Sequence, residues 1–189
     1  MRWREKQVEI LYKITTGSRK VRLLLTPVGP IIFFSIIALF IFISLQLDKL
    51  LRFPKLFFSP LNLIISVPFF AIGLFLWGWS VLHFIKARGT PVPFNPPPKV
   101  VSTGPYAYAR NPMLSGIFIF LFGLGILLRS ISLCFIFTPL FILFNLWEIK
   151  AVEEPELEKR LGKEYLEYKN KVPRFFPCLK PGIKKSFTE

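Results

Sequence analysis

The sequence predicts an all-α integral membrane protein with about four transmembrane helices. We expect the last two to form a tight helical hairpin, followed by a cytosolic C-terminal helical tail. Two observations support this fold class. Hydrophobic residues make up 52% of the 189 residues, and they occur in long unbroken runs, as in helices that have lipid as their solvent. Positively charged residues also gather on one side of the predicted topology.

Four apolar segments define the predicted helices. Their bounds are Val28–Leu47, Leu61–Ile85, Pro112–Leu128 and Ile131–Trp147. The last two segments are short for a bilayer core, since 17 residues at 1.5 Å per residue span about 25 Å. Only Arg129 and Ser130 separate these two segments, so a tight hairpin is expected. Gly123 and Gly125 are expected to allow close packing within it.

The positive charges predict the orientation in the membrane. Segments 1–27, 86–111 and 148–189 lie on one side and contain 7, 4 and 10 Lys and Arg residues, or 21 of the total of 25. The positive-inside rule places this side, with both termini and the candidate active site, in the cytoplasm. Topology and contact with membrane lipids explain the net charge of +14 better than nucleic-acid binding does. Met1–Arg22 mixes apolar and basic residues and is expected to be an interfacial helix.

The sequence divides into two functional regions. Residues 1–85 contain the interfacial segment and the first two spans, and they carry no motif. Residues 86–189 contain a stiff proline-rich loop, the hairpin and the tail. The prolines of the loop are Pro91, Pro93, Pro96, Pro97 and Pro98. A single histidine, His83, and two cysteines, Cys134 and Cys178, predict neither a metal site nor a disulfide framework.

Polar residues cluster at the predicted cytoplasmic boundary of the second region. They are Tyr106, Tyr108, Arg110, Asn111, Asn145, Glu148, Glu153, Glu154, Tyr165, Tyr168 and Arg174. The hairpin is expected to bring Arg110 and Glu148 to the same end of adjacent helices. A second interpretation fits the composition equally well: these Tyr and Arg side chains are simply the anchors that membrane helices carry at the interface, and then they form no site.

The order of these residues resembles a known family. The stretch G-P-Y-A-Y-A-R-N-P-M-L-S-G at 104–116 is similar to the G-P-Y-x-x-x-R-[H/N]-P-x-x-x-G signature of the isoprenylcysteine carboxyl methyltransferase family and the related phospholipid methyltransferases. The acidic pair at 153–154, L-G-K-E-Y-L-E-Y at 161–168 and V-P at 172–173 resemble the tail of that family. Gly89-Thr90-Pro91, Pro93 and Pro97-Pro98 resemble the G-T-P-x-P-x-x-P-P segment that precedes this signature in prokaryotic members. The resemblance covers about residues 86–180.

The resemblance implies a methyltransferase that uses S-adenosyl-L-methionine and releases S-adenosyl-L-homocysteine. It implies a cytosol-facing cofactor pocket and a lipophilic substrate that enters from the bilayer. That substrate is the carboxylate of a prenylated cysteine-like compound or the amine of a phospholipid. The implied catalytic residues are Arg110, Asn111 and Arg174. The implied cofactor-binding residues are Gly104, Tyr106, Arg110, Asn111, Pro112, Glu153, Glu154 and Tyr165, with no metal.

Within this scheme each residue type suits a part of the cofactor. Glu153 or Glu154 can bind the ribose diol, and Tyr106 or Tyr165 can present an aromatic face to the sulfonium. Arg110 or Arg174 can hold a carboxylate of the cofactor or the substrate in a bidentate grip.

Two positions depart from the family pattern. Asn111 replaces the histidine of the eukaryotic enzymes, and an asparagine cannot act as a base near neutral pH. Leu114 stands where many members have tyrosine, which removes a hydroxyl from the site. Both changes concern the substrate more than the cofactor.

Two other functions are compatible with parts of the sequence. One is a membrane reductase of the steroid-reductase type that uses NADPH, against which the Glu153–Glu154 pair argues because a phosphate-rich cofactor requires positive charge. The other is a non-enzymatic membrane scaffold, in which the proline loop and the tail would tolerate substitution freely. The sequence leaves open the methyl acceptor, the choice between O-, N- and S-methylation, the oligomeric state and the host membrane.

Overall fold

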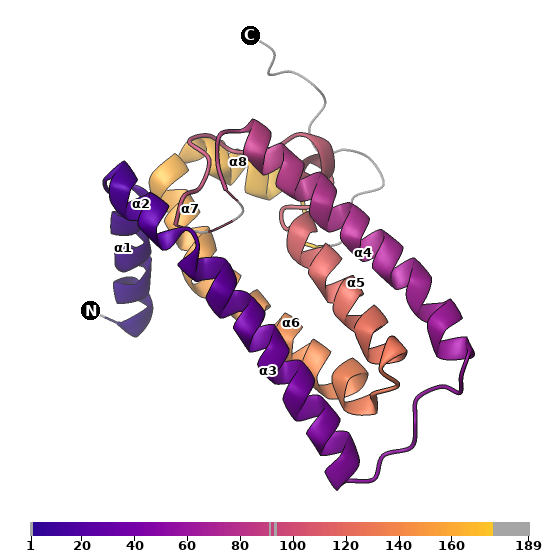
Figure 1. Cartoon of the computed structure of the whole chain (residues 1–189). Helices are drawn as coiled ribbons and strands as arrows, with labels where there is room; N and C mark the ends of the chain where they lie inside the picture. The colour runs from indigo at the N-terminus through magenta and orange to yellow at the C-terminus, as the bar shows by residue number, and fades with distance from the viewer. Residues whose placement is uncertain (1, 91, 93, 176–189) are drawn as a thin grey trace.

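The computed structural model describes residues 2–90, 92 and 94–175, and within them every regular element is helical (Figure 1). The predicted features at Pro91, Pro93 and Cys178 lie outside the described residues. In chain order the elements are α1 (Trp3–Thr15), α2 (Arg19–Leu25), α3 (Val28–Leu50), α4 (Leu61–Lys86), η1 (Gly104–Ala107), α5 (Pro112–Leu127), η2 (Leu133–Phe137), α6 (Thr138–Glu148), η3 (Ile149–Glu153), α7 (Glu154–Leu161) and α8 (Lys163–Lys171). The all-α prediction is therefore confirmed for this part of the chain.

Three of the helical stretches are long and apolar enough to cross a membrane. They are Arg19–Leu50, Leu61–Lys86 and Leu133–Leu161. The third predicted span, Pro112–Leu128, is present as α5, but its 16 residues extend only about 24 Å. A crossing by α5 therefore stays a prediction, while α3 and α4 begin at the predicted residues.

The closest helix pair is α4 with α5, not the predicted pair of the last two segments (Figure 1). A Cβ added to Gly73 of α4 would lie 2.8 Å from the Gly116 carbonyl oxygen of α5, and one added to Gly116 would lie 2.7 Å from the Gly73 oxygen. Gly123 packs in the same way on Phe69 of α4, so its predicted place within the hairpin is wrong. Gly125 packs on Cys134 of η2, and so it allows close packing within the hairpin as predicted. Small residues let the two backbones approach each other without competing side chains.

The last long helix does not stop at the predicted boundary after Trp147. It continues without a break through α6, η3 and α7 to Leu161. Two π turns, η2 and η3, interrupt its α-helical pattern, and each is followed by a proline at the second residue of the next α segment, Pro139 and Pro155. A proline ring clashes with the preceding turn of a regular α-helix and has no N–H to donate, and the wider π turn accommodates both effects.

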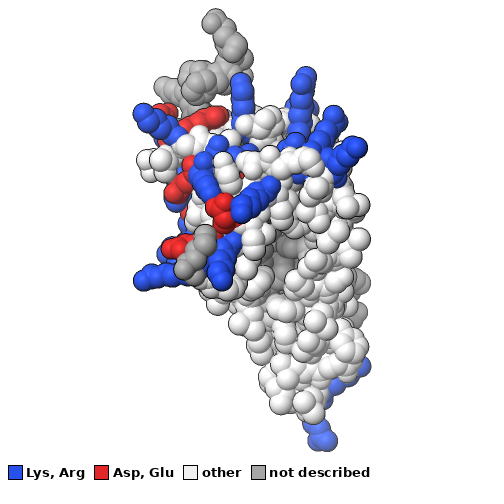
Figure 2. Space-filling view, turned by 90° about the vertical axis from the view of Figure 1, so that its left-hand side faces the viewer, with Lys and Arg blue, Asp and Glu red and all other residues white. Residues whose placement is uncertain are grey.

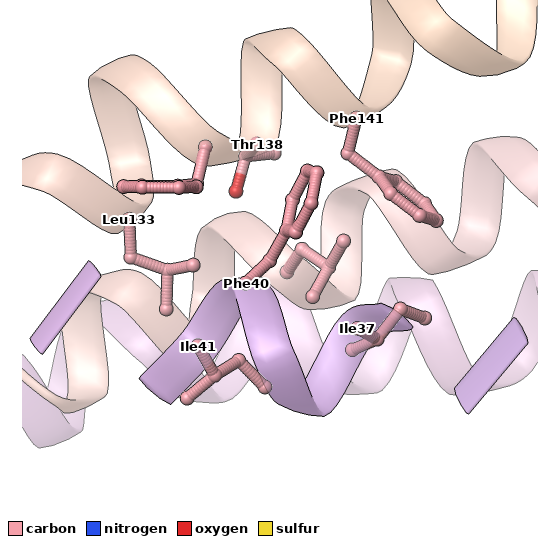
Figure 3. A pocket seen from close by; sticks show the side chains of 8 residues that line it. Ile37, Phe40, Ile41, Leu133, Thr138 and Phe141 are labelled. Atoms are coloured by element: carbon pink, nitrogen blue, oxygen red, sulfur yellow. The ribbon is translucent and has the colours of Figure 1, made fainter. Parts of the chain in front are cut away.

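Aromatic side chains hold α3 against α5 and α6. Phe118, Leu121 and Phe141 are buried at the centre of this contact, and Phe33 and Phe40 of α3 pack on Phe141 with ring centroids 5.6 and 6.1 Å away. A narrow pocket without room for a water molecule lies beside them (Figure 3). Its lining consists of Ile37, Phe40, Ile41, Leu121, Leu133, Phe137, Thr138 and Phe141. Because only Thr138 is polar, this pocket lacks the groups that a charged cofactor requires.

A network of hydrogen bonds, which we call the polar lock, joins the loops at one end of the bundle. At this end α3 and α5 finish and α4 and η2 begin. The Asp48 carboxylate accepts hydrogen bonds from the Ser130 hydroxyl and, at 2.9 Å, from the Ser132 backbone N–H. The Arg129 Nε donates to the Phe57 carbonyl at 2.6 Å. Asn62 Nδ2 donates to the Leu127 carbonyl at 2.8 Å. These bonds tie the two interhelical loops together.

The charged residues gather at the other end of the molecule. Figure 2 shows Lys, Arg, Asp and Glu side chains crowded at the upper end, a broad surface without charge below them, and a few basic side chains at the lower tip. For the residues that the structure describes, this separation fits the sidedness predicted from the sequence. The assignment of that end to the cytoplasm stays a prediction from the positive-inside rule.

Replacement of Asp48 by Ala tests the polar lock. The variant leaves the Ser132 N–H and the Ser130 hydroxyl without their acceptor, so the free energy of unfolding should fall by about 1–3 kcal/mol. Thermal unfolding of the detergent-solubilised protein measures the change. Lys49→Ala removes an exposed neighbour and should stay within about 0.5 kcal/mol of the wild type. Equal stability of the two variants would contradict a structural role for the lock.

Candidate active site

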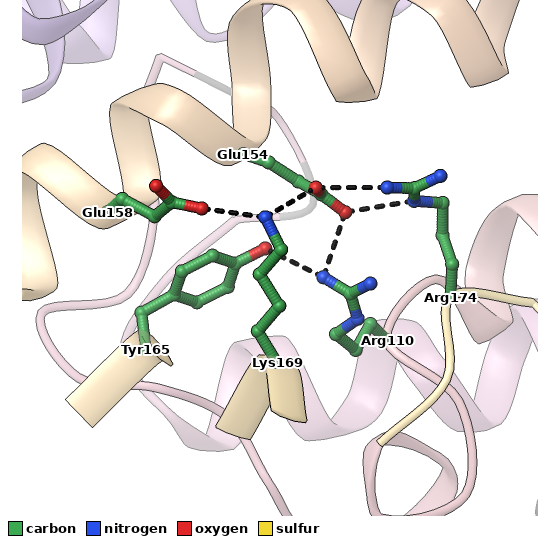
Figure 4. Close-up of polar contacts among 6 residues, drawn as sticks. All are labelled: Arg110, Glu154, Glu158, Tyr165, Lys169 and Arg174. Carbon is green, nitrogen blue, oxygen red and sulfur yellow. Dashed lines mark hydrogen bonds and ion pairs between the residues drawn. The ribbon is translucent and has the colours of Figure 1, made fainter. Parts of the chain in front are cut away.

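The buried carboxylate of Glu154 organises the charged end of the molecule (Figure 4). Glu154 is 3% exposed and begins α7. Arg110 Nη1 lies 2.8 Å from its Oε1, and Lys169 Nζ lies 3.0 Å from its Oε2. Arg174 binds both oxygens, with Nε 2.9 Å from Oε1 and Nη2 3.0 Å from Oε2. One carboxylate thus joins the loop before α5, helix α8 and the segment after α8. We call these four residues the Glu154 cluster.

The Glu154 cluster carries more positive than negative charge. Its three cations face Glu154 and, through a 2.7 Å contact with Lys169, Glu158. Hydrogen bonds to Glu158 and Glu154 raise the pKa of Lys169, and hydrogen bonds to Glu154 raise the pKa of Arg174, so both stay protonated at neutral pH. The Arg110 Nε is buried and has no hydrogen-bond partner among the described residues. The site therefore has a net charge of about +1 and an unused buried donor, which suits an additional anionic group.

Tyr165 supports Arg110 from α8. The Arg110 Nη1 donates to the Tyr165 hydroxyl oxygen at 3.3 Å. Burial, and secondarily the negative charge of Glu154, raises the pKa of Tyr165, so the phenol stays neutral. Tyr165 is 4% exposed, and its polar contact with the Glu154 cluster is the hydrogen bond that its hydroxyl accepts from Arg110.

Two backbone hydrogen bonds attach the tail to the loop before α5. The Arg110 N–H donates to the Pro173 carbonyl at 2.8 Å, and the Asn111 N–H donates to the Arg174 carbonyl at 3.0 Å. Asn111 is the residue before Pro112, which starts α5. The backbone of Asn111 is thereby held by the tail on one side and by the start of α5 on the other. The side-chain amide of Asn111 makes no hydrogen bond within the described part of the chain.

The segment around η1 is held against α4. Tyr106 is 4% exposed, its ring lies 5.0 Å from that of Phe84, and its carbonyl accepts a 2.7 Å hydrogen bond from the Tyr168 hydroxyl. Gly104 has φ +59°, and a Cβ at this position would overlap the His83 ring. His83 thus acts as a packing residue, with its Nδ1 2.9 Å from the Trp79 carbonyl oxygen. Gly104 is required by this close approach as well as by its backbone conformation.

The structure brings together four of the predicted site residues: Arg110, Glu154, Tyr165 and Arg174. Glu153 is the neighbour of Glu154 and is half-buried, without an ion-pair partner among the described residues. Arg110 was expected at the same end of the hairpin as Glu148, and its ion-pair partner there is Glu154. The Glu154 carboxylate lies one and a half turns further along the same continuous helix, beyond the π turn η3.

One residue of the cluster, Lys169, was not predicted. It lies four positions after Tyr165 on α8 and therefore on the same helix face. That spacing is the sequence signal that identifies it, together with the acidic residue Glu158 that it also contacts. Of the two tyrosines predicted as alternatives to face the sulfonium, Tyr106 packs its ring against Phe84 of α4, and Tyr165 lies beside Arg110.

Comparison with known proteins shows a family match over the middle of the chain. The model of the family described as phospholipid methyltransferase matches residues 61–164. A relative, the nickel-cobalt-cadmium resistance protein NccN of Alcaligenes xylosoxydans xylosoxydans, is 35% identical over 101 residues, which are 53% of this chain and 43% of the relative. The chain thus matches less than half of that relative's length. No solved structure matches the chain.

Replacement of Glu154 by Gln tests the role of its charge in the cluster. The variant keeps the shape of the side chain but leaves three cations facing one another, so the free energy of unfolding should fall by about 3 kcal/mol. The matched variant Glu158→Gln removes a carboxylate that is 36% exposed and should change stability by less than about 1 kcal/mol. Thermal unfolding without ligand compares the two. A larger loss in Glu158→Gln would contradict the central place of Glu154.

Proposed function

The chain belongs to the phospholipid methyltransferase family, and from this premise we propose that it transfers the methyl group of S-adenosyl-L-methionine to a lipophilic acceptor. The family implies a membrane methyltransferase. The methyl donor and the class of acceptor are our proposal. The observation that carries it is the surplus of positive charge in the Glu154 cluster at the charged end of a bundle of apolar helices.

The residues of the Glu154 cluster fit the carboxylate of the methyl donor. Arg110 offers a buried Nε without a partner among the described residues, and Arg174, with 27% of its side chain exposed, is open to solvent. A guanidinium binds a carboxylate through two parallel hydrogen bonds. We assign this role to Arg110, with Arg174 beside it, and Tyr165 positions Arg110 through its hydroxyl.

Glu153 is the better candidate for the ribose diol. Glu154 already accepts bonds from three cations, so its lone pairs are engaged in the arrangement described above. Glu153 has no ion-pair partner among the described residues and is the last residue of the π turn η3. Gly104, Tyr106 and Pro112 then support the site through the backbone, by setting the course of the loop between α4 and α5.

The acceptor is proposed to approach Asn111 from the lipid side. When bound, the donor supplies a methyl group on a sulfonium, and transfer is an in-line displacement that depends mainly on positioning. The Asn111 amide can orient an acceptor oxygen or nitrogen by hydrogen bonding but cannot remove its proton. A carboxylate acceptor, such as that of a prenylated cysteine-like compound, needs no base. A phospholipid amine releases its proton to Glu148 or to water.

The other functions considered from the sequence have less support. The family match favours methyl transfer over an NADPH-dependent reductase. A passive scaffold does not account for three cations gathered on one buried carboxylate. Metal resistance appears in the name of the relative NccN alone, and the residues that the structure describes in this chain contain no group of three His, Cys, Asp or Glu side chains that could hold a metal ion.

Calorimetric titration of S-adenosyl-L-homocysteine into the detergent-solubilised protein tests the donor site. The wild type should bind, and Arg110→Ala should weaken binding by about 10–100-fold, because a charge-assisted hydrogen bond to a carboxylate contributes about 1.5–3 kcal/mol. The affinity of Arg110→Lys should lie between those of the wild type and Arg110→Ala. Lysine keeps the positive charge but lacks the planar guanidinium whose parallel N–H donors match a carboxylate.

Lys86→Ala is the matched control, because Lys86 is an exposed cation at the same end of the molecule. It should bind S-adenosyl-L-homocysteine as the wild type does. Absence of wild-type binding at millimolar ligand, or protection of the protein by NADPH instead, would reject the proposed function.

A further inference from the structure

The two N-terminal helices present an unusual surface of exposed basic and apolar side chains. The exposed basic residues are Arg4, Lys6, Lys13, Arg19 and Lys20. The large exposed apolar residues among them include Trp3, Val21, Leu23 and Leu24, of which Leu24 is 75% exposed. None of the residues of α2 is buried. We call this set of nine side chains the N-terminal basic surface.

A hydrogen bond and an ion pair attach helix α1 to helix α7. The Thr15 hydroxyl donates a 2.6 Å hydrogen bond to Glu156 of α7, and both residues are buried. Lys159 of α7 pairs with Glu9 and lies 4.1 Å from the centre of the Tyr12 ring. The N-terminal basic surface therefore has a defined position relative to the bundle, on the face of α1 and α2 that these contacts leave exposed.

The lengths of α2 and α3 indicate where a membrane surface would meet them. Helix α3 alone has 23 residues and extends about 35 Å, which is enough to cross a hydrocarbon core about 30 Å thick. Helix α2 is separated from it at Thr26 and Pro27 and has three basic residues among seven, so we expect α2 to lie outside the core. Trp3 stacks on Trp147, with ring centroids 5.6 Å apart, near the end of α6. Both helices thus lie where a membrane surface would meet them.

We propose that the N-terminal basic surface binds the anionic headgroups of the surrounding leaflet. Basic side chains attract anionic lipid, and exposed Trp and Leu side chains enter the boundary between headgroups and acyl chains. A nucleic acid would satisfy the charges but would leave the apolar side chains in water. The exposed Leu23 and Leu24 therefore favour a lipid surface. This inference is independent of the methyl donor and of the acceptor.

Hydrogen exchange of the full-length protein in nanodiscs tests the proposal. The amides of α1 and α2 should exchange more slowly in discs that contain phosphatidylglycerol than in discs of phosphatidylcholine alone, and high salt should reverse the effect. The triple variant Arg4→Gln, Lys6→Gln, Lys13→Gln should lose most of this protection, by about fivefold for each charge removed.

The control is the triple variant Lys150→Gln, Lys163→Gln, Lys171→Gln, which removes three exposed basic residues elsewhere at the same end. It should keep the protection of α1 and α2 by phosphatidylglycerol. The proposal is overturned if the wild type exchanges equally in both kinds of disc, or if the two triple variants lose protection equally. It is also overturned if duplex DNA protects α1 and α2 in phosphatidylcholine discs as well as phosphatidylglycerol does.

Discussion

The pairing of one buried carboxylate with three cations is the interaction on which the charged end of this protein depends. Glu154 is 3% exposed, and a carboxylate at that depth is unfavourable unless opposite charges and hydrogen bonds compensate it. Arg110, Lys169 and Arg174 supply both from three different segments. The requirement to satisfy Glu154 therefore brings the loop before α5, helix α8 and the tail to one place. The two backbone bonds from residues 110 and 111 to the tail then fix their register.

The membrane bundle positions the partners of Glu154. The glycine contacts between α4 and α5 set the start of α5, and with it Arg110 and Asn111. The continuous helix from η2 to α7 carries Glu154 from the apolar region to the charged end, and the π turn η3 sets the direction of its side chain. Packing in the apolar region thus determines the geometry of the polar site. The surplus positive charge that results is what an anionic cofactor group requires.

The sequence predicted the elements of the fold better than their packing. The first two spans follow from hydropathy, because a chain in lipid must satisfy its backbone groups within each helix. The pairing of α4 with α5 depends on Gly73 and Gly116, which are far apart in the sequence and give no local signal. Hydropathy puts the end of the last apolar segment at Trp147, whereas the helix that contains it continues through η3 and α7 to Leu161.

The family motif supplied most of the candidate site. The resemblance named Arg110, Glu154, Tyr165 and Arg174, but it did not show that Arg110 and Arg174 both pair with Glu154. Lys169 was missed because a lysine on a charged helix is usually a solvated residue. Its place in the cluster depends on the approach of α7 to α8 after the turn at Gly162, where φ is +59°.

The central claim is that the Glu154 cluster forms a methyl-donor site at the membrane boundary. Transfer of a labelled methyl group from S-adenosyl-L-methionine into the lipid fraction of proteoliposomes tests it most directly. The account predicts label in the lipids with the wild type, and loss of most of that label with Arg174→Gln, which should insert into the liposomes as the wild type does. No label above that of empty liposomes, or equal label from Arg174→Gln, would contradict the account.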